Sequence, residues 1–360
     1  MSVDDRVAVR TPAPKSRVRD AVDNGLRRPR KSADSKLLLY LARKLHDNET
    51  AFGLMRNAFR LLQRIGISVS PNHYYWPVPD FRKLELRKWP EEEKEPIGLN
   101  LRFDRQLDFL QNVVSRYRAE WQFHSAPMFG AGYEYNNGFF EAVDAEIAYC
   151  MIRHYKPRRI VEVGGGYSSR VLAAALDRNL KSDGVCGNLV TIEPYPERFP
   201  KNTLFNNVQV IAETVQNVCA GVFLGLQRGD FLFLDSSHVV GVGSDVVREY
   251  LEIIPRLAGG VLIHAHDIFI PGDYPRESVL RNLAFWSEQY LLQAFLMFNQ
   301  QFEVLWGSSY MQSRAHRELD DAFPHWKCSY RNMTGGKRRF LPTRDGNRVW
   351  PSSFWIRKLA

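Results

Sequence analysis

The chain has 360 residues, a formal net charge of +9, 44% hydrophobic residues and 12% aromatic residues, a composition typical of a globular protein. No apolar run approaches the roughly 18 residues of a membrane-spanning helix, and the N-terminus lacks the apolar core of a signal peptide. These absences predict a soluble, cytoplasmic protein without a membrane span. The four cysteines are widely separated and form no CxxC pair, so we expect free thiols.

Much of the positive charge lies in an N-terminal tail. Residues 1–36 contain ten Lys or Arg and five Asp, which is more than half of the net excess. Because this tail is polar and has no apolar periodicity, we predict that it is disordered. A second basic cluster, residues 335–348, also has the pattern of a loop. No aromatic-interleaved basic strand or RNA-binding motif accompanies the charge, so we predict no nucleic-acid partner.

Residues 37–135 are predicted to form a helical and irregular N-terminal extension. Apolar residues recur at helical spacing between Lys36 and Ile65, and again over Leu101–Trp121. The segment between these helices, residues 70–90, is dense in Pro and aromatic residues, which favours an ordered but irregular conformation.

Strands and helices alternate in the third predicted domain, residues 136–360. A helical stripe of Val143, Ile147 and Met151 comes first and is expected to pack in the core. Five apolar runs then have the length and composition of buried strands: Arg159–Val163, Leu189–Glu193, Val208–Ile211, Phe231–Asp235 and Gly260–His264. This alternation predicts an α/β fold with a parallel, doubly wound sheet.

The C-terminal part of this domain has a different pattern. A helix is expected over residues 244–257, before the fifth strand, and one long helix over Arg276–Asn299. Two strand-like runs follow, Phe302–Tyr310 and Ser353–Lys358, with no helical period between them. That ending predicts a terminal antiparallel strand.

The turn after the first predicted strand carries the strongest local signal of function. Three glycines, Gly164–Gly166, separate the strand from a helical pattern. Glycine lets backbone N–H groups approach a ligand where a Cβ would block it. The second, fourth and fifth strands each end in a carboxylate or histidine, and ligands bind at this carboxyl edge of an open α/β sheet. A nicotinamide dehydrogenase is disfavoured, because its GxGxxG fingerprint needs glycine where Ser169 stands.

The motifs EVGGGYSS, IEPYP and DSSH…HAHDIFxPxDYP resemble those of class I S-adenosylmethionine-dependent methyltransferases. The resemblance runs from about Pro71 to the C-terminus. It implies a Rossmann-like sheet of seven strands whose last strand is antiparallel. It also implies that S-adenosylmethionine contacts the residues at the first strands' carboxyl ends: Glu162, Gly164, Gly165, Gly166, Ser168, Glu193 and Asp235. Glu193 would accept hydrogen bonds from the ribose hydroxyls.

The ends of the fourth and fifth strands suggest the catalytic groups. Asp235 and the pair His266–Asp267 follow adjacent strands, whose spacing in a sheet is about 5 Å. By resemblance to catechol-type O-methyltransferases, these three side chains would hold Mg²⁺ or Mn²⁺. His238 stands three residues beyond Asp235, where those enzymes carry their general base, and a histidine suits that role near neutral pH. The alternatives are that His238 is an ordinary loop histidine and that Asp235 caps the next turn.

The predicted function is O-methylation of a small acceptor, a sugar or another hydroxylated metabolite. The catalytic residues would be His238 and Asp235. Two alternatives stay open: an enzyme like the cephalosporin hydroxylase group, which shares this fold, and a non-catalytic cofactor-binding partner. The sequence does not define the oligomeric state.

Overall fold

A computed structural model describes residues 49–70, 72, 75–89, 95–121, 133, 135, 137–198, 207–323 and 351–360. The predicted disordered tail (1–36), the basic cluster (335–348) and Cys328 lie outside these residues. The chain divides into two compact units between Asp80 and Phe81. In the first unit, α2 (Glu49–Gln63) forms within the first predicted helical region and ends in a turn over residues 64–66.

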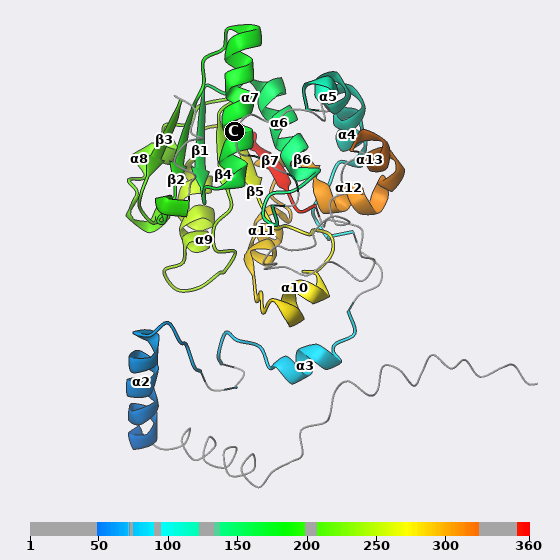
Figure 1. Cartoon of the computed structure of the whole chain (residues 1–360). Coiled ribbons are helices and arrows are strands. Elements are labelled where there is room, and N and C mark those ends of the chain that lie inside the picture. Colours follow the sequence, from blue (N-terminus) through cyan, green and yellow to red (C-terminus); the bar gives the residue numbers. More distant parts are fainter. Residues whose placement is uncertain are drawn as a thin grey trace, which may run out of the picture. The chain divides into compact units, whose positions relative to one another are not determined.

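The second unit is built on one sheet of seven strands (Figure 1). The strands are β1 (Arg159–Val163), β2 (Asn188–Ile192), β3 (Val208–Ile211), β4 (Phe231–Leu234), β5 (Leu262–Ala265), β6 (Phe302–Gly307) and β7 (Phe354–Lys358). Their spatial order is β3-β2-β1-β4-β5-β7-β6. The first five run parallel, whereas β7 is antiparallel to both β5 and β6. The predicted fold class, including the antiparallel last strand, is confirmed.

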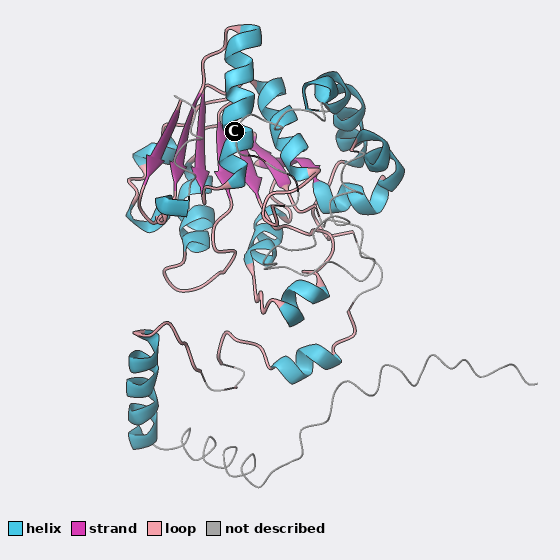
Figure 2. Ribbon diagram, viewed as in Figure 1, coloured by secondary structure: helices cyan, strands magenta, loops and turns pink. Residues whose placement is uncertain are grey.

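Helices cover the sheet (Figure 2), and its central strand β4 is fully apolar. All four residues of β4 are at most 1% exposed. α6 (Asp144–Tyr155) packs along α7 (Tyr167–Asp183), and the predicted stripe of Val143, Ile147 and Met151 is buried there. A strand buried on both sides needs a continuous apolar run, which is the pattern that the sequence showed.

Several predicted helix boundaries are wrong. Residues 276–299 form two helices, α10 (Arg276–Arg281) and α11 (Glu288–Leu296), instead of one. The chain leaves the helical conformation between them, where Leu283 has φ 55 and the N–H groups of Ser287 and Glu288 donate to the carbonyl of His238. A long-range contact therefore breaks a locally helical pattern.

Helices also form where none was expected, between β6 and β7. These are α12 (Ser308–Arg314) and α13 (His316–Ala322), so the strand predicted to reach Tyr310 ends at Gly307. The helix expected over residues 244–257 is α-helical only over α9 (Asp245–Arg248). It continues as a π-helical turn, Glu249–Ile253, and a 3₁₀ turn, Ile254–Arg256.

Residues 81–121 of the predicted N-terminal extension belong to the compact unit that contains the sheet. They contain α3 (Phe81–Leu86), α4 (Phe103–Asp108), a π-helical segment Phe109–Val114 and α5 (Ser115–Trp121). Leu110, Val114 and Trp121 join its hydrophobic core. Within the described ranges, no helix is long and apolar enough to cross a membrane, and Cys150, Cys186 and Cys219 are free.

Candidate functional site

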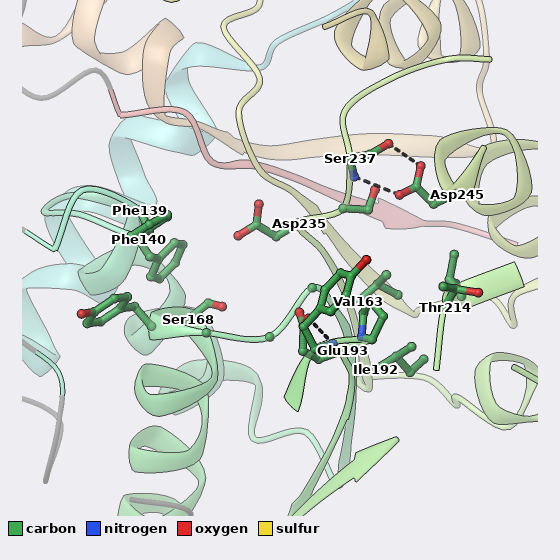
Figure 3. Close-up of a pocket in the computed structure, with 18 of the residues that line it drawn as sticks. Phe139, Phe140, Val163, Ser168, Ile192, Glu193, Thr214, Asp235, Ser237 and Asp245 are labelled. Atoms are coloured by element: carbon green, nitrogen blue, oxygen red, sulfur yellow. Dashed lines mark hydrogen bonds between the residues drawn. The ribbon is translucent and has the colours of Figure 1, made fainter. Parts of the chain in front are cut away.

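A cavity of about 760 Å³ opens at the carboxyl ends of β1, β2 and β4 (Figure 3). Its lining comes from several segments: Phe139, Phe140, residues 163–168, residues 192–195, residues 214–216, residues 235–237 and Asp245. The predicted cofactor-binding residues in this lining are Gly164, Gly165, Gly166, Ser168, Glu193 and Asp235. The cavity therefore lies at the carboxyl edge of the sheet, where the sequence predicts ligand binding.

Two glycines of the β1 turn, Gly164 and Gly166, have different structural roles. Gly164 has φ +82, and a Cβ there would lie 1.8 Å from the backbone oxygen of Asp235. Only glycine fits at position 164, because the end of β1 lies in close contact with the end of β4. Gly166 also lines the cavity, but an added Cβ there would meet nothing within 4 Å. Close approach of a ligand is therefore a reason for glycine at Gly166, whereas Gly164 is already required by the chain itself.

Glu162 is fully buried and is not part of the cavity lining. Its carboxylate accepts hydrogen bonds from the hydroxyls of Ser168, Ser169 and Thr191 at 2.6–2.7 Å. Burial raises the pKa of Glu162 to about 7 against the opposing effect of these three hydroxyls. The Ser169 hydroxyl also accepts from the N–H of Gly166 at 3.0 Å. Glu162 thus holds the start of α7 in place from beneath the glycine turn.

Glu193 follows β2 directly and is 8% exposed. Its Oε1 accepts a hydrogen bond from the N–H of Tyr195 at 2.8 Å, which fixes the carboxylate against the cavity. No bond to Oε2 is found among the described contacts. The side chain is therefore placed as a fixed acceptor with one oxygen available.

Asp235 and His238 meet at the end of β4. Nε2 of His238 lies 3.4 Å from Oδ1 of Asp235 and 3.5 Å from Oδ2 of Asp267. On the other side of the ring, Nδ1 lies 2.8 Å from Oε2 of Glu288. Burial lowers the pKa of His238, but the bonds to Asp235 and Glu288 and the charge of Asp267 outweigh it and raise this pKa well above its usual value.

The neighbouring histidines change the pKa of Asp235. Burial raises its pKa, but the positive charges of His266 and His238 outweigh burial and hold the pKa of Asp235 below its usual value. Asp235 does not cap the following turn. The carboxylate of Asp245 does so instead: it accepts hydrogen bonds from the N–H of Ser237 at 3.0 Å and from the hydroxyl of Ser237 at 2.5 Å. In Figure 3 the Asp235 carboxylate lies between the Phe139–Phe140 side and the Glu193 side of the cavity.

The three predicted metal ligands do not form a metal site as they are placed. Asp235 and Asp267 converge on Nε2 of His238, so an imidazole lies where a cation between the two carboxylates would have to be. His266 stands apart, with Nε2 3.4 Å from the carbonyl oxygen of Phe139 and 3.9 Å from Oδ1 of Asp267. Across the part of the chain that the structure describes, no group of three or more His, Cys, Asp or Glu has the arrangement to hold a metal ion.

His264 has the structural role that its place inside an apolar strand suggests. The ring is fully buried, stacks on Phe233 with centroids 3.8 Å apart, and has Nε2 2.9 Å from the hydroxyl oxygen of Ser353. Burial and the charges of His266 and His238 lower its pKa well below the usual value. His264 is therefore a neutral core residue.

Sequence reasoning missed the aromatic wall of the cavity and the buried partner of His238. Phe139 is 55% exposed and stacks on Tyr167, with centroids 6.0 Å apart and planes at 12°. Phe139 follows the sequence Asn-Asn-Gly and Tyr167 follows the three glycines, and no periodic pattern marks either ring. Glu288 lies 50 residues beyond His238 within a helical pattern, so no local signal could have identified it.

Parts of this chain are similar to known proteins. Residues 161–268 match a family model described as a methyltransferase domain. An uncharacterized protein of Archaeoglobus fulgidus is 30% identical over 174 residues, which cover 46% of this chain and 77% of that protein. A solved structure described as "cmcI-D160 Mg-SAM" is 14% identical, covers 60% of this chain and 71% of its own, and has a TM-score of 0.31. An O-methyltransferase from Bacillus cereus in complex with SAH is 17% identical, with coverages of 55% and 81% and a TM-score of 0.27.

The sheet order, the glycine turn after β1 and the cavity at the carboxyl edge define a class I methyltransferase fold. The chain belongs to the class I S-adenosylmethionine-dependent methyltransferase family, and S-adenosylmethionine is the methyl donor of that family.

Proposed function

We propose that this methyltransferase transfers the methyl group of S-adenosylmethionine to a hydroxyl oxygen of a small acceptor, a sugar or another hydroxylated metabolite. The observation that carries the proposal is the cluster at the end of β4, where Nε2 of His238 lies within 3.5 Å of carboxylate oxygens of both Asp235 and Asp267. An imidazole beside carboxylates can accept the proton that the substrate hydroxyl must lose during methyl transfer. Asp235 connects this cluster to the cavity, because it lines the cavity together with the apolar rings of Phe139 and Tyr167, whereas His238 lies outside the lining.

In this proposal the donor lies along the glycine turn. Gly164, Gly165, Gly166 and Ser168 surround its methionine part, because they line the cavity at the start of α7. Glu193 accepts from the ribose hydroxyls through the oxygen that Tyr195 leaves available. Glu162 contributes indirectly, by fixing the Ser168 hydroxyl at 2.7 Å.

The transfer itself is an in-line displacement at the methyl carbon. A bond forms between the acceptor oxygen and the methyl carbon, the bond from that carbon to the sulfonium sulfur breaks, and S-adenosylhomocysteine leaves. The hydroxyl proton passes to Nε2 of His238 in its neutral form. Asp235, Asp267 and Glu288 then stabilise the resulting imidazolium, because each places a carboxylate oxygen within 3.5 Å of a ring nitrogen. Holding the two reactants in line supplies most of the remaining rate.

No step of this proposal uses a metal ion. The cation between Asp235 and Asp267 is the imidazolium of His238, and the third predicted ligand, His266, does not complete a coordination set. The proposal therefore rests on proton transfer and positioning by this chain's own side chains.

The direct test is incubation of the purified protein with methyl-labelled S-adenosylmethionine and a mixture of hydroxylated metabolites and sugars, with product analysis by mass spectrometry. We expect labelled O-methyl products and one S-adenosylhomocysteine for each. Labelled products methylated on nitrogen or carbon would contradict the assignment to oxygen. Binding of 2-oxoglutarate by titration calorimetry with no methyl transfer would favour the hydroxylase alternative, and donor binding without any turnover would favour a non-catalytic partner.

A further inference from the structure

Glu288 directly follows the break between α10 and α11 and places a carboxylate against His238. It is the first residue of α11 and is 1% exposed. The N–H groups of Ser287 and Glu288 donate to the carbonyl oxygen of His238 at 2.8 and 3.1 Å. The hydroxyl oxygen of Ser287 accepts from the N–H of Val240 at 2.8 Å. The loop that carries His238 is thus attached to the start of α11 through its backbone.

The side chain of Glu288 continues this attachment to the ring. Its Oε2 lies 2.8 Å from Nδ1 of His238, and its Oε1 accepts from the hydroxyl of Tyr250 at 2.8 Å. Tyr250 is fully buried in the π-helical turn Glu249–Ile253. With a partner on each oxygen, this carboxylate has one orientation, and so has the imidazole that it contacts.

The consequence for His238 follows from the chemistry of imidazole. Carboxylates face both ring nitrogens, but Glu288 lies nearer to Nδ1, at 2.8 Å, than Asp235 and Asp267 lie to Nε2, at 3.4 and 3.5 Å. In the neutral ring the proton therefore stays on Nδ1, and Nε2 is the atom that exchanges a proton with a ligand. Nε2 is the nitrogen that faces Asp235 and Asp267. The backbone bonds to the His238 carbonyl fix the position of the ring, and Glu288 fixes its orientation, with Nε2 pointing toward Asp235 and Asp267.

We infer that Glu288 is the positioning residue of His238: it orients the ring through Nδ1, fixes the tautomer and stabilises the imidazolium formed when Nε2 takes the acceptor's proton. This inference rests on the proposed function for its kinetic consequence. Glu288 does not line the cavity, and its Oε2 contacts Nδ1 of His238, so its effect on catalysis passes through His238.

The test is a double-mutant cycle of Glu288→Gln and His238→Gln, with Glu252→Gln, which removes an exposed carboxylate from the same π-helical turn, as the matched control. We expect Glu288→Gln to lower kcat roughly 10- to 100-fold, a part of the usual contribution of a general base, with the KM values for donor and acceptor within about twofold. In the His238→Gln background, Glu288→Gln should have no further effect on kcat. Glu252→Gln should match the wild type.

Two outcomes would overturn the inference: an unchanged kcat in a folded Glu288→Gln protein, or an equal fold-loss in both backgrounds. If Glu288→Gln does not fold, Glu288→Asp replaces it. This variant keeps the charge but withdraws it by one methylene, so we again expect a loss of kcat that vanishes without His238.

A readout independent of turnover separates this inference from the proposed function. In ¹⁵N spectra of histidine-labelled protein, the Nδ1 signal of His238 should be that of a protonated nitrogen in the wild type and should shift in Glu288→Gln. A wild-type protein that methylates nothing, yet gives this spectrum, contradicts the proposed function alone. An active enzyme whose Nδ1 signal is unmoved by Glu288→Gln contradicts the positioning role alone.

Discussion

Nε2 of His238 and Oδ1 of Asp235 lie 3.4 Å apart at the carboxyl end of β4, three residues from each other along the chain. His238 reaches this position with a backbone φ of 62, in the left-handed region that non-glycine residues seldom adopt. Strain of this kind persists where surrounding contacts impose it, and the bonds from Ser287 and Glu288 to the His238 carbonyl are such contacts. The imidazole is therefore held, rather than free, against Asp235, which lines the cavity.

The first prediction concerns the pH dependence of the reaction. His238 accepts a proton only when neutral, and its neighbouring carboxylates raise its pKa above the usual value near 6.5. The rate should therefore increase with pH through a limb that lies above pH 6.5. His238→Ala should lose this limb and lower kcat by roughly 10²–10⁴, whereas His154→Ala, at an exposed histidine of α6, should leave both unchanged. A pH profile of kcat measures this, and a limb retained by His238→Ala would assign the proton to another group.

The second prediction concerns donor recognition by Glu193. Glu193→Ala should weaken S-adenosylhomocysteine binding by about 2–3 kcal/mol, since hydrogen bonds to a charged group have this scale. Glu197→Ala is the control, because Glu197 is exposed and outside the cavity lining. Titration calorimetry gives both affinities. Equal affinities for a folded Glu193→Ala protein and the wild type would remove Glu193 from the donor site.

The third prediction separates the two structural roles of the glycine turn. Gly164→Ala should lower the melting temperature strongly, because its Cβ would clash with the Asp235 backbone at 1.8 Å and the residue would need φ +82. Gly166→Ala meets nothing within 4 Å, so it should fold with little loss of stability but bind the donor more weakly. Calorimetric melting and ligand titration of both variants check this. The opposite ranking would mean that the donor does not pass along Gly166.

The fourth prediction concerns metal ions. Since His238 occupies the point where Asp235 and Asp267 converge, methyl transfer should be unchanged in excess EDTA, and Mg²⁺ or Mn²⁺ should not bind at the micromolar level. Activity assays and calorimetric titration of the metal-depleted protein measure the two effects. Loss of activity with a chelator, with recovery on adding Mg²⁺ or Mn²⁺, would contradict this geometry and restore the metal predicted from the sequence.

The amino-acid sequence by itself determined the sheet and the edge at which the cavity lies. Buried parallel strands need continuous apolar runs, and β1 and β3 were located with their observed bounds for this reason. The others differ by a few residues at their ends, as local patterns allow. The glycine turn and the polar residues after β2 and β4 are also local features, so the sequence predicts Gly164–Gly166, Glu193 and Asp235 as site residues, and all five line the cavity.

Only the tertiary structure decided how the groups around His238 are arranged. Glu288 is separated from His238 by 50 residues, and its place in the chain predicts an ordinary helix. Next to the break between α10 and α11, the backbone N–H groups of Ser287 and Glu288 bond to the carbonyl oxygen of His238 and not within a helix. The side chains of Asp235, Glu288 and Asp267 raise the pKa of His238 above its usual value, and Nε2 of His266 lies 3.9 Å from Oδ1 of Asp267, outside the ligand set expected of it. Two of the three carboxylates near His238, Glu288 and Asp267, are distant from it in sequence, and no local periodicity encodes their contacts.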